Sequence, residues 1–579
     1  LKDSASASAT SKAVGGLTNG TEYVFRITAL DGDGYESGYS NEVEGTPAYK
    51  GPVWYVDDDG SSSGEGSSSD PMREIQDAIY AAASGDTVLV LPGTYDRSGD
   101  QELEFATSSS DDTGKNIVLK SRDGAATTIL DGEGSKTLFE IDDETDTTLQ
   151  IIGFTIYDGG GGNNVNSGSA VHISGQQSWD GNNNYTVEYS GATFRNCIFT
   201  ETTSAYPVIF GVRSNVQFID CEIKNNTISH DEWSYPVIKF MSSSNVVINR
   251  CKITNNKNIS DGYWAYGGAM FFTGQSGVTN VKVVNSVIAN NEALVTNGGG
   301  PAIGGAFCIE WGGVNVTVIN STIVGNTADN DAGFNESGGV AFINSYNEDS
   351  ENNFTVFNSI ISDNYPAGDN GLFYVSDYSE LKVSYSIIEG IDVSNYDEED
   401  YVYTHTPVFI DTVDVDPSDY YQLHPSSLGI GAGASTGEDV EEHTISAPTV
   451  DIAGNARPNP TGSNPDLGAY ESALAITPYP DAPSALAGTA SHQSVSLSWT
   501  APDEDDVVKY FVYQADSTSS GWSSWAIADT LDSLTSTATT ITGLTNDRLY
   551  GFYVTSVDNS DYESSASSQV KLTPIYLGP

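Results

Sequence analysis

The chain has 579 residues, and its 23 Lys and Arg stand against 79 Asp and Glu, which gives a formal net charge of −56. A field of this sign repels nucleic acids and anionic membrane surfaces, so we expect neither as a partner. No run of about 18 apolar residues is present, so no segment is predicted to span a membrane as a helix. With 59 Gly, 32 Tyr and 3 Met, the composition favours a secreted all-β chain, extracellular or at the cell surface.

The excess of acidic residues has two explanations. It keeps a large exposed protein soluble, or it binds divalent cations. Calcium is therefore the one cofactor that the sequence leaves open, and no metal ligand can be named. The acidic run from Asp31 to Glu36 looks like a calcium loop, but it lacks the spaced ligands of an EF-hand and is interpreted as a turn between strands.

The two ends of the chain repeat each other. Residues 16–52 and 543–579 align without a gap at an offset of 527, and 18 of these 37 positions are identical. The C-terminal copy extends back to about residue 477 through alternating apolar and polar residues, for example at 494–499 and 508–513. This alternation predicts short strands with one buried face.

Two details of the C-terminal copy carry a family resemblance. Trp499 ends the second strand, and Leu544 precedes Tyr550 by six residues. The copy therefore resembles a fibronectin type III domain, whose tyrosine corner has this spacing. The resemblance implies a β-sandwich at 476–579 and the C-terminal part of a second one at 1–47, whose first strands would precede residue 1. Such modules are spacers or adhesive elements.

The region 48–475 is similar at both ends to another family. The run from Val53 to Asp57, the amphipathic stretch after Asp70-Pro71 and the run Gly85 to Val90 resemble the opening of pectate-lyase-like right-handed parallel β-helix proteins. A capping helix is expected at about 70–83, with Asp70 as its N-cap and Pro71 at its first position. Segments starting at Asp451 and Asp466 resemble the closing part of such secreted proteins. The resemblance implies a fold, but not an activity.

Within this region one motif recurs, approximately Asn-x-x-apolar-x-Asn-Cys/Ser-x-Ile-x-x-Asn. Its Cys/Ser column runs from Cys197 to Ser386 with a mean spacing of 31.5 residues, which predicts a solenoid of stacked coils. Equivalent residues of successive coils then lie about 4.8 Å apart, so the small Cys and Ser side chains stack inside. The cysteines are interpreted as small hydrophobic residues rather than disulfides. The last Asn of each motif is predicted to form a ladder at a left-handed turn.

A column of outward-facing residues is predicted by aligning the strands on their leading Pro or Gly. The column consists of Phe210, Lys239, Phe271, Cys308, Phe342 and Tyr374. Aromatic rings on such a face suit stacking against sugars. The alternative is that these rings pack against the long loops. The predicted carbohydrate-binding residues are Tyr206, Trp233, Tyr235, Trp264, Tyr266, Phe271, Trp311 and Tyr374.

Catalysis has weak candidates in the sequence. Lys239 and Arg213 are candidate bases for a polysaccharide lyase, and Glu310 is a candidate acid for a glycoside hydrolase. No lyase motif is present, so whether the chain is an enzyme stays open. The favoured hypothesis is an extracellular or cell-surface structural or adhesive protein, part of a repeating β-helix–fibronectin III array. In this hypothesis it binds a polysaccharide or another extracellular surface component, or associates head to tail into filaments. The alternative is a secreted polysaccharide lyase or glycoside hydrolase.

Overall fold

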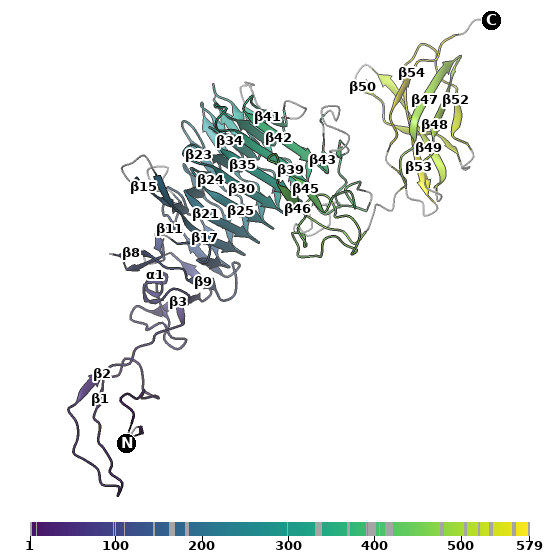
Figure 1. Ribbon diagram of the computed structural model, residues 1–579. Coiled ribbons are helices and arrows are strands. Elements are labelled where there is room, and N and C mark those ends of the chain that lie inside the picture. Colours follow the sequence, from purple (N-terminus) through teal and green to yellow (C-terminus); the bar gives the residue numbers. More distant parts are fainter. Residues whose placement is uncertain are drawn as a thin grey trace. The chain divides into compact units, whose positions relative to one another are not determined.

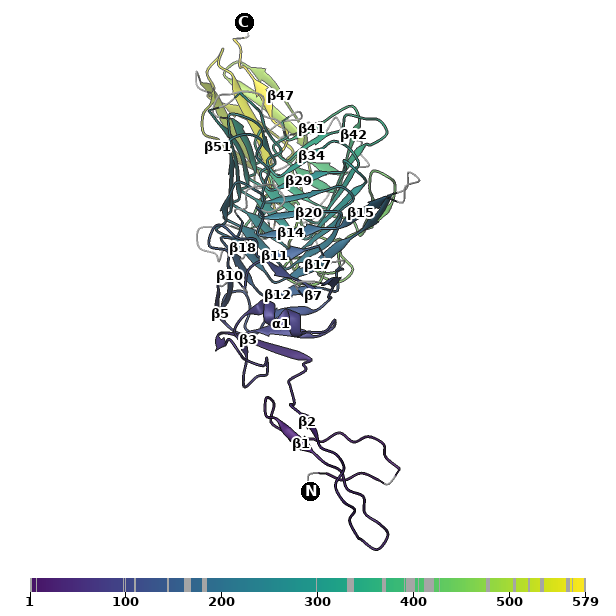
Figure 2. The same cartoon turned by 90° about the vertical axis from the view of Figure 1, so that its left-hand side faces the viewer.

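The computed structural model (Figures 1 and 2) shows a nearly all-β chain with a parallel β-solenoid and a C-terminal β-sandwich. The chain forms two compact units: residues 1–318, 323–355 and 363–382, and residues 319–322, 356–362 and 383–579. The structure describes residues 3–6, 8–96, 98, 100–108, 111–142, 145–160, 168–179, 185–297, 299–330, 338–366, 371–389, 391, 401–404, 406–410, 421–425, 427–474, 480–502, 507–518, 521–531, 536–558, 563–564 and 566–576.

Three long parallel sheets build the solenoid, and the chain passes from one to the next within each coil. Sheet 1 contains β3 (Val53–Ser61), β4 (Thr87–Val90), β9 (Val118–Ser121), β12 (Gln150–Ile152), β17 (Ser190–Arg195), β21 (Ser214–Ile219), β25 (Asn245–Asn249), β30 (Thr279–Val284), β35 (Val314–Ile319), β39 (Asn352–Phe357) and β42 (Ser379–Ser384). Sheet 2 contains β5 (Gly93–Tyr95), β10 (Thr128–Asp131), β13 (Thr155–Tyr157), β18 (Ile198–Thr200), β22 (Glu222–Lys224), β26 (Lys252–Thr254), β31 (Val287–Ala289), β36 (Thr322–Val324), β40 (Ile360–Ser362), β43 (Ser386–Ile388) and β44 (Val402–Tyr403).

Sheet 3 carries the predicted outward column, and smaller sheets flank the coils. Sheet 3 contains β6 (Leu103–Glu104), β11 (Phe139–Ile141), β14 (Val171–Ser174), β20 (Ile209–Val212), β24 (Ile238–Met241), β29 (Met270–Thr273), β34 (Phe307–Glu310), β38 (Ala341–Asn344) and β41 (Phe373–Val375). The smaller sheets contain β19 (Thr203–Ser204), β23 (Thr227–His230), β27 (Lys257–Asp261), β32 (Glu292–Thr296) and β37 (Thr327–Asn330), and the pairs β7 (Ala106–Ser108) with β8 (Asp111–Gly114), β15 (Gln176–Trp179) with β16 (Tyr185–Glu188), β28 (Ala265–Tyr266) with β33 (Ala302–Ile303), and β45 (Thr436–Glu438) with β46 (Thr444–Ser446).

The predicted Asn ladder is present and fully buried. The side-chain amide of each member donates to the Oδ1 of the next over 2.9–3.0 Å. The members are Asn226, Asn256, Asn291, Asn326 and Asn364. Their backbone is not left-handed, so that part of the prediction is wrong. The left-handed residue is the one before, as at Asn255 and Asn290 with φ of 57° and 56°. It makes the sharp corner, and the ladder residue that follows points inward.

The Cys/Ser column is confirmed as an inner stack. Cys197, Cys221 and Cys251, the three cysteines of the column, are buried and free of disulfides. Where serine replaces cysteine, its hydroxyl accepts from the backbone N–H of the preceding coil: Ser286 from Cys251 over 3.1 Å, and Ser359 from Ser321 over 3.1 Å. A small side chain is needed here because the coils lie one strand spacing apart.

The helix of the described residues, α1 (Ile75–Ala81), lies at the first coils beside β3 and β7 (Figures 1 and 2). Ile75, Ala78 and Ile79 are buried against the coil end, as expected of a cap that covers an apolar edge. The predicted start at Asp70 is wrong, because Asp70 closes a turn with Ser67. The N-cap is Glu74, and the N–H of Ile75 donates instead to Asp100 over 2.8 Å. Nowhere in the described ranges does a helix have the length and apolarity needed to cross a membrane.

A buried ion pair organises the predicted closing segment. Arg457 Nε donates to Glu471 Oε2 over 2.8 Å, and both side chains are inaccessible to solvent. The Arg457 guanidinium also donates to the carbonyl of Gly468 over 3.0 Å, and the backbone N–H of Asp466 donates to Glu471. These hydrogen bonds satisfy the buried charges, as a buried ion pair requires.

The C-terminal module is a two-sheet sandwich. One sheet contains β47 (Ser484–Ser491), β48 (Ser494–Thr500) and β52 (Ala538–Thr542), and the other β49 (Val507–Thr518), β50 (Gly521–Trp522), β51 (Ala526–Leu531), β53 (Tyr550–Asp558) and β54 (Val570–Leu572). Trp499 packs on Tyr510 in its core at 5.4 Å between ring centroids. The Tyr550 hydroxyl accepts from the Thr545 N–H over 3.0 Å, which is the predicted tyrosine corner.

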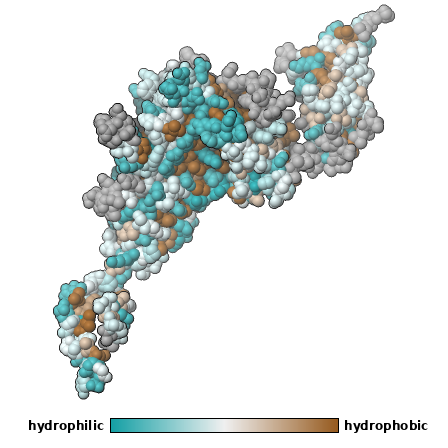
Figure 3. All heavy atoms as spheres, in the orientation of Figure 1, coloured by the Kyte–Doolittle hydropathy of each residue, from teal (hydrophilic) through white to brown (hydrophobic). Residues whose placement is uncertain are grey.

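The N-terminal copy has the same local structure as the C-terminal one. β1 (Tyr23–Phe25) pairs with β2 (Val43–Gly45) in the register that β53 has with β54, shifted by 527 residues. The Tyr23 hydroxyl accepts from the Thr18 N–H over 3.0 Å, as in the C-terminal corner. Its apolar side chains are exposed, however: Ile27 is 76% and Leu30 70% accessible. Brown, apolar surface is visible on this segment in Figure 3. The acidic run at 31–36 is a turn, because Asp31 Oδ1 accepts from two backbone N–H groups within it.

Candidate functional site: the outer face of sheet 3

The predicted outward column is present in sheet 3. The parallel register places these residues opposite one another in successive strands: Phe210, Lys239, Phe271, Cys308, Phe342 and Tyr374. The column continues one strand further, to His172, which pairs with Phe210 and stacks on its ring at 5.5 Å. The alignment misses His172 because Ser169 stands where the other strands have their leading Pro or Gly.

Loops between the coils fold back over the column and bury its centre. β28 and β33 pair in parallel in two of these loops. The result is an apolar cluster that is separate from the coil interior, which we call the outer aromatic cluster: Tyr235, Trp264, Tyr266, Phe271, Ile303, Cys308 and Phe342. Tyr235 stacks on Tyr266 at 5.3 Å and meets Phe271 edge-on at 5.0 Å. At the centre of the column the rings therefore pack against the long loops, which is the alternative that the sequence left open.

Exposed rings surround the outer aromatic cluster. Trp311 is 37% exposed and meets Phe271 edge-on at 5.8 Å, and Tyr374 is 39% exposed and stacks on Phe342 at 4.5 Å. Tyr346 is also exposed, and its side chain has a hydrogen bond with that of Asn344 at the end of β38. We call Trp311, Tyr374 and Tyr346 the aromatic rim. Tyr346 lies in the loop after β38, where no strand periodicity marks it, and the sequence does not single it out.

Trp311 has an unusual backbone. Its φ is 64°, in the left-handed region that a bulky side chain rarely adopts. Gly312 and Gly313 follow with φ of 77° and 73°. Arg213 and Ser242, at the equivalent position of earlier coils, also have a left-handed backbone with φ of 49° and 54°, so this turn is a recurrent corner of the coil. The turn directs the chain so that the Trp311 ring contacts the outer aromatic cluster while staying accessible.

Lys239 lies among aromatic rings. Its ammonium is 3.3 Å from the centroid of Tyr235, 5.5 Å from that of Phe271 and 5.8 Å from that of Phe210. No carboxylate of a described residue lies within ion-pair distance of it. Burial lowers the pKa of Lys239 to about 7, because the cation–π attraction offsets only part of the lost hydration.

Glu310 is the second buried ionisable group at this face. It is 2% exposed, and burial raises its pKa to about 7, against the opposing effect of a hydrogen bond with the Asn344 side chain. Its charge in turn raises the pKa of Tyr235, after burial, to about 12. Glu310 stands two coils from Lys239 and two residues along the strand. Parallel strand spacing therefore separates their Cα atoms by about 12 Å.

The other predicted residues lie apart from this cluster. Arg213 follows β20, and its Nε donates to the carbonyl of Gly175 over 2.8 Å, which holds a corner of the coil. Tyr206 packs beside His230 at 6.2 Å, and Trp233 projects from the loop before β24. No group of three or more His, Cys, Asp or Glu side chains among the described residues has the arrangement of a metal site.

The fold defines an all-β protein in which a parallel β-solenoid precedes a sandwich module. Residues 481–571 match the family profile of the fibronectin type III domain. A solenoid joined to such a domain fits an extracellular structural or adhesive protein.

Several solved structures are similar to part of this chain. They include the FN5 domain of Drosophila Lar (17% identity, 17% of this chain and 98% of that chain, TM-score 0.15) and an Fn3-like protein from Clostridium thermocellum (23%, 17% and 98%, TM-score 0.14). Another is titin kinase with its flanking domains (24% identity, 17% of each chain, TM-score 0.15). A comparison with curated proteins gave no match.

Proposed function

We propose that this chain is a segment of an extracellular structural or adhesive protein in which solenoids and fibronectin III modules alternate. The observation that carries the proposal is the shared register of β1–β2 and β53–β54, before and after one solenoid in the sequence. A unit that recurs along one chain suits a long array, and head-to-tail association of such arrays into filaments follows the same logic.

The proposed adhesive surface is the aromatic rim, with a polysaccharide as its ligand. Rigid coils hold the exposed rings of Trp311 and Tyr374 on a buried aromatic layer, so few rotamers are lost on binding. Flat rings suit the apolar faces of sugars. A net charge of −56 opposes acidic polysaccharides unless calcium bridges them.

Affinity gel electrophoresis of the whole chain tests this surface. We expect at least one neutral polysaccharide, such as arabinoxylan or galactomannan, to retard the chain. Trp311→Ala with Tyr374→Ala should weaken that retardation by about tenfold or more, since a lost aromatic contact costs about 1–3 kcal/mol. Tyr157→Ala is the matched control, because Tyr157 is equally exposed but lies in sheet 2. If Tyr157→Ala weakened the retardation as much as the double variant does, the aromatic rim would not be the binding surface.

A polysaccharide lyase or glycoside hydrolase remains the second candidate, favoured by the near-neutral pKa values of Glu310 and Lys239. Groups tuned to the working pH are typical of acid–base catalysis. Product release from a panel of neutral and acidic polysaccharides, with and without calcium, distinguishes the two. Activity abolished by Glu310→Gln or Lys239→Met would establish the enzyme, and binding without product would support the adhesive role.

A further inference from the structure

A second row of aromatic rings lies on the outer side of the fibronectin III module. On the sheet that contains β49 and β53, Tyr513 stacks on Tyr553 at 4.6 Å, and Trp525 lies 4.7 Å from Tyr553. Trp522 continues the row at 6.3 Å from Trp525, with their planes 29° apart. The neighbours of Tyr553 along β53, Phe552 and Val554, point into the core. The row therefore serves no purpose in packing the sandwich interior, and its Trp522 end is exposed.

A glycine makes room for the two indoles. A Cβ on Gly551 would lie 3.0 Å from Cη2 of Trp525 and 3.3 Å from Cζ3 of Trp522. Both rings therefore lie against the bare backbone of β53. The equivalent position of the N-terminal copy, 527 residues earlier, is Val24. The glycine is thus not a requirement of the module fold, and it belongs with the aromatic row.

Polar groups border the row. The Glu563 carboxylate accepts from the Tyr513 hydroxyl over 2.8 Å and from the Thr555 hydroxyl over 2.7 Å, both at Oε1. Its Oε2 has no hydrogen bond to a described residue. The Lys571 ammonium lies 5.6 Å from the Trp522 centroid at the other side. Fixed rings with an acceptor and a donor at their edge are the usual composition of a sugar site.

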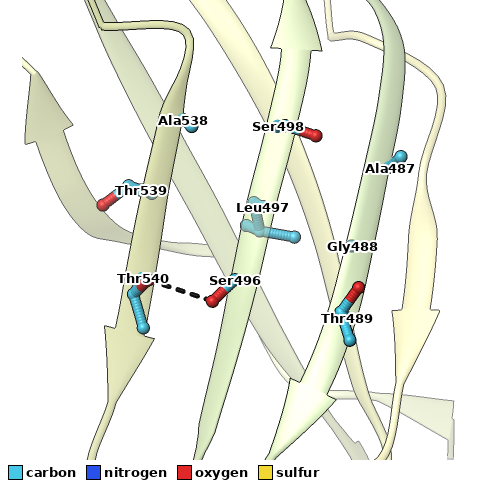
Figure 4. Close-up of a pocket in the computed structure, with 9 residues that line it drawn as sticks. All are labelled: Ala487, Gly488, Thr489, Ser496, Leu497, Ser498, Ala538, Thr539 and Thr540. Carbon is cyan, nitrogen blue, oxygen red and sulfur yellow. Dashed lines mark hydrogen bonds between the residues drawn. The ribbon is translucent and has the colours of Figure 1, made fainter.

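The opposite sheet of the same module provides a contrast. Figure 4 shows its outward side chains, which are small and polar, such as Thr489, Ser496 and Thr540. Ser496 and Thr540 hydrogen-bond to each other over 3.0 Å (Figure 4). Hydroxyl side chains on the outer face of this sheet are enough to keep it soluble. A row of four large rings that is half-buried along its length and exposed at Trp522 calls for a ligand on the other face.

We propose that the aromatic row Tyr513, Trp522, Trp525 and Tyr553 binds a neutral polysaccharide. Stacked rings cover the apolar faces of successive sugar units, and Glu563 and Lys571 meet hydroxyls at the edge. The charge of −56 on the whole chain disfavours an acidic glycan or a nucleic acid as occupant. This site lies on the module and does not depend on the aromatic rim of the solenoid.

Affinity gels with the full chain test the proposal, using arabinoxylan, galactomannan and mixed-linkage β-glucan as neutral probes and alginate as the acidic one. Trp522→Ala with Trp525→Ala should raise the Kd for at least one neutral probe by about tenfold or more. Gly551→Val, which keeps both indoles but displaces them, should weaken binding in the same direction. Ser496→Ala, on the polar sheet, should leave it unchanged. Near-ultraviolet circular dichroism and the thermal midpoint verify that each variant folds.

The outcomes separate this site from the solenoid rim. Loss in the Trp522/Trp525 and Gly551 variants, with binding retained by the Trp311/Tyr374 variant, assigns a glycan site to the module. Unchanged binding in both module variants overturns the proposal, whatever the rim variants do. Retardation by none of the neutral probes also overturns it. A change in self-association on sedimentation, without a change in glycan binding, would assign the row to a protein contact instead.

Discussion

The side-chain amides of the Asn ladder each satisfy groups in two neighbouring coils. Asn291 donates to Asn326 Oδ1 and to the carbonyl of Ile253, both over 2.9 Å, and accepts from Asn256 over 2.9 Å. Asn291→Ala would leave several buried donors and acceptors unpaired. We expect a loss of about 3 kcal/mol in the free energy of unfolding, measured in urea. Asn280→Ala is the control, since Asn280 belongs to an exposed ladder of the same coils and should cost under about 1 kcal/mol.

Lys239 and Glu310 predict opposite pH dependences of stability. Between about pH 4.5 and 7 Glu310 binds a proton in the folded state but not in the unfolded one, so its contribution to stability falls as pH rises. Between about pH 7 and 10.5 Lys239 is neutral when folded but charged when unfolded, so stability rises with pH there. Each slope is at most about 1.4 kcal/mol per pH unit.

Urea unfolding at pH 5, 7 and 9 checks both signs. The quantity compared is the free energy of unfolding of each variant minus that of the parent chain. This difference should increase from pH 5 to 7 for Glu310→Gln. It should decrease from pH 7 to 9 for Lys239→Met. The pH 7 to 9 interval serves as the internal control for Glu310→Gln, and pH 5 to 7 for Lys239→Met. Differences that are flat across pH would contradict the burial of these two groups.

At the scale of elements, β1 lacks the neighbour that β53 has. β53 pairs with β49 on one side and β54 on the other, whereas β1 pairs with β2 alone in the described residues. We expect that a copy of residues 480–542, joined directly before Gly16, supplies the missing strands. Amide exchange in β1 should then slow by about a hundredfold or more, because protection tracks local stability. The control is the same fusion with Trp499→Asp in the added copy. Unchanged amide exchange of β1 in the fusion without this substitution would contradict the interpretation of residues 1–47 as the C-terminal part of a fibronectin III module.

Elements whose residues repeat were predictable, and those formed by loops were not. The column from Phe210 to Tyr374 follows from a two-residue alternation that each strand restarts after a Pro or Gly. Its burial does not follow, because Tyr235 and Trp264 reach it from loops without periodicity. The predicted start of α1 is wrong because Asp70-Pro71 has the local chemistry of a helix N-terminus, whereas in the folded chain Asp70 pairs with Ser67 in a turn. The aromatic row of the module does not follow from the sequence, since its rings come from three strands and a loop.

At the scale of the whole molecule, the charge of −56 predicts sensitivity to salt. Raising NaCl from 0.01 to 0.15 M shortens the screening length from about 30 to about 8 Å, which weakens self-repulsion in the folded state. We expect the unfolding midpoint in urea to rise. Calcium at the same ionic strength should produce the same rise if the acidic residues act as a diffuse charge. A larger shift with calcium would contradict this and indicate a specific site.

The Asn ladder also determines how this protein can change in length. Every interior Asn of the ladder accepts through Oδ1 from the coil before and donates through Nδ2 to the coil after. The same contacts can therefore be made whatever the number of coils. Removing residues 256–290, which joins Asn255 to Asn291, keeps each inner contact and shortens the stack by one step. Removing a single residue breaks the corner and the ladder together. The length of the solenoid can therefore change in steps of one whole coil. A single duplication or deletion of a coil-length segment adds or removes one such step.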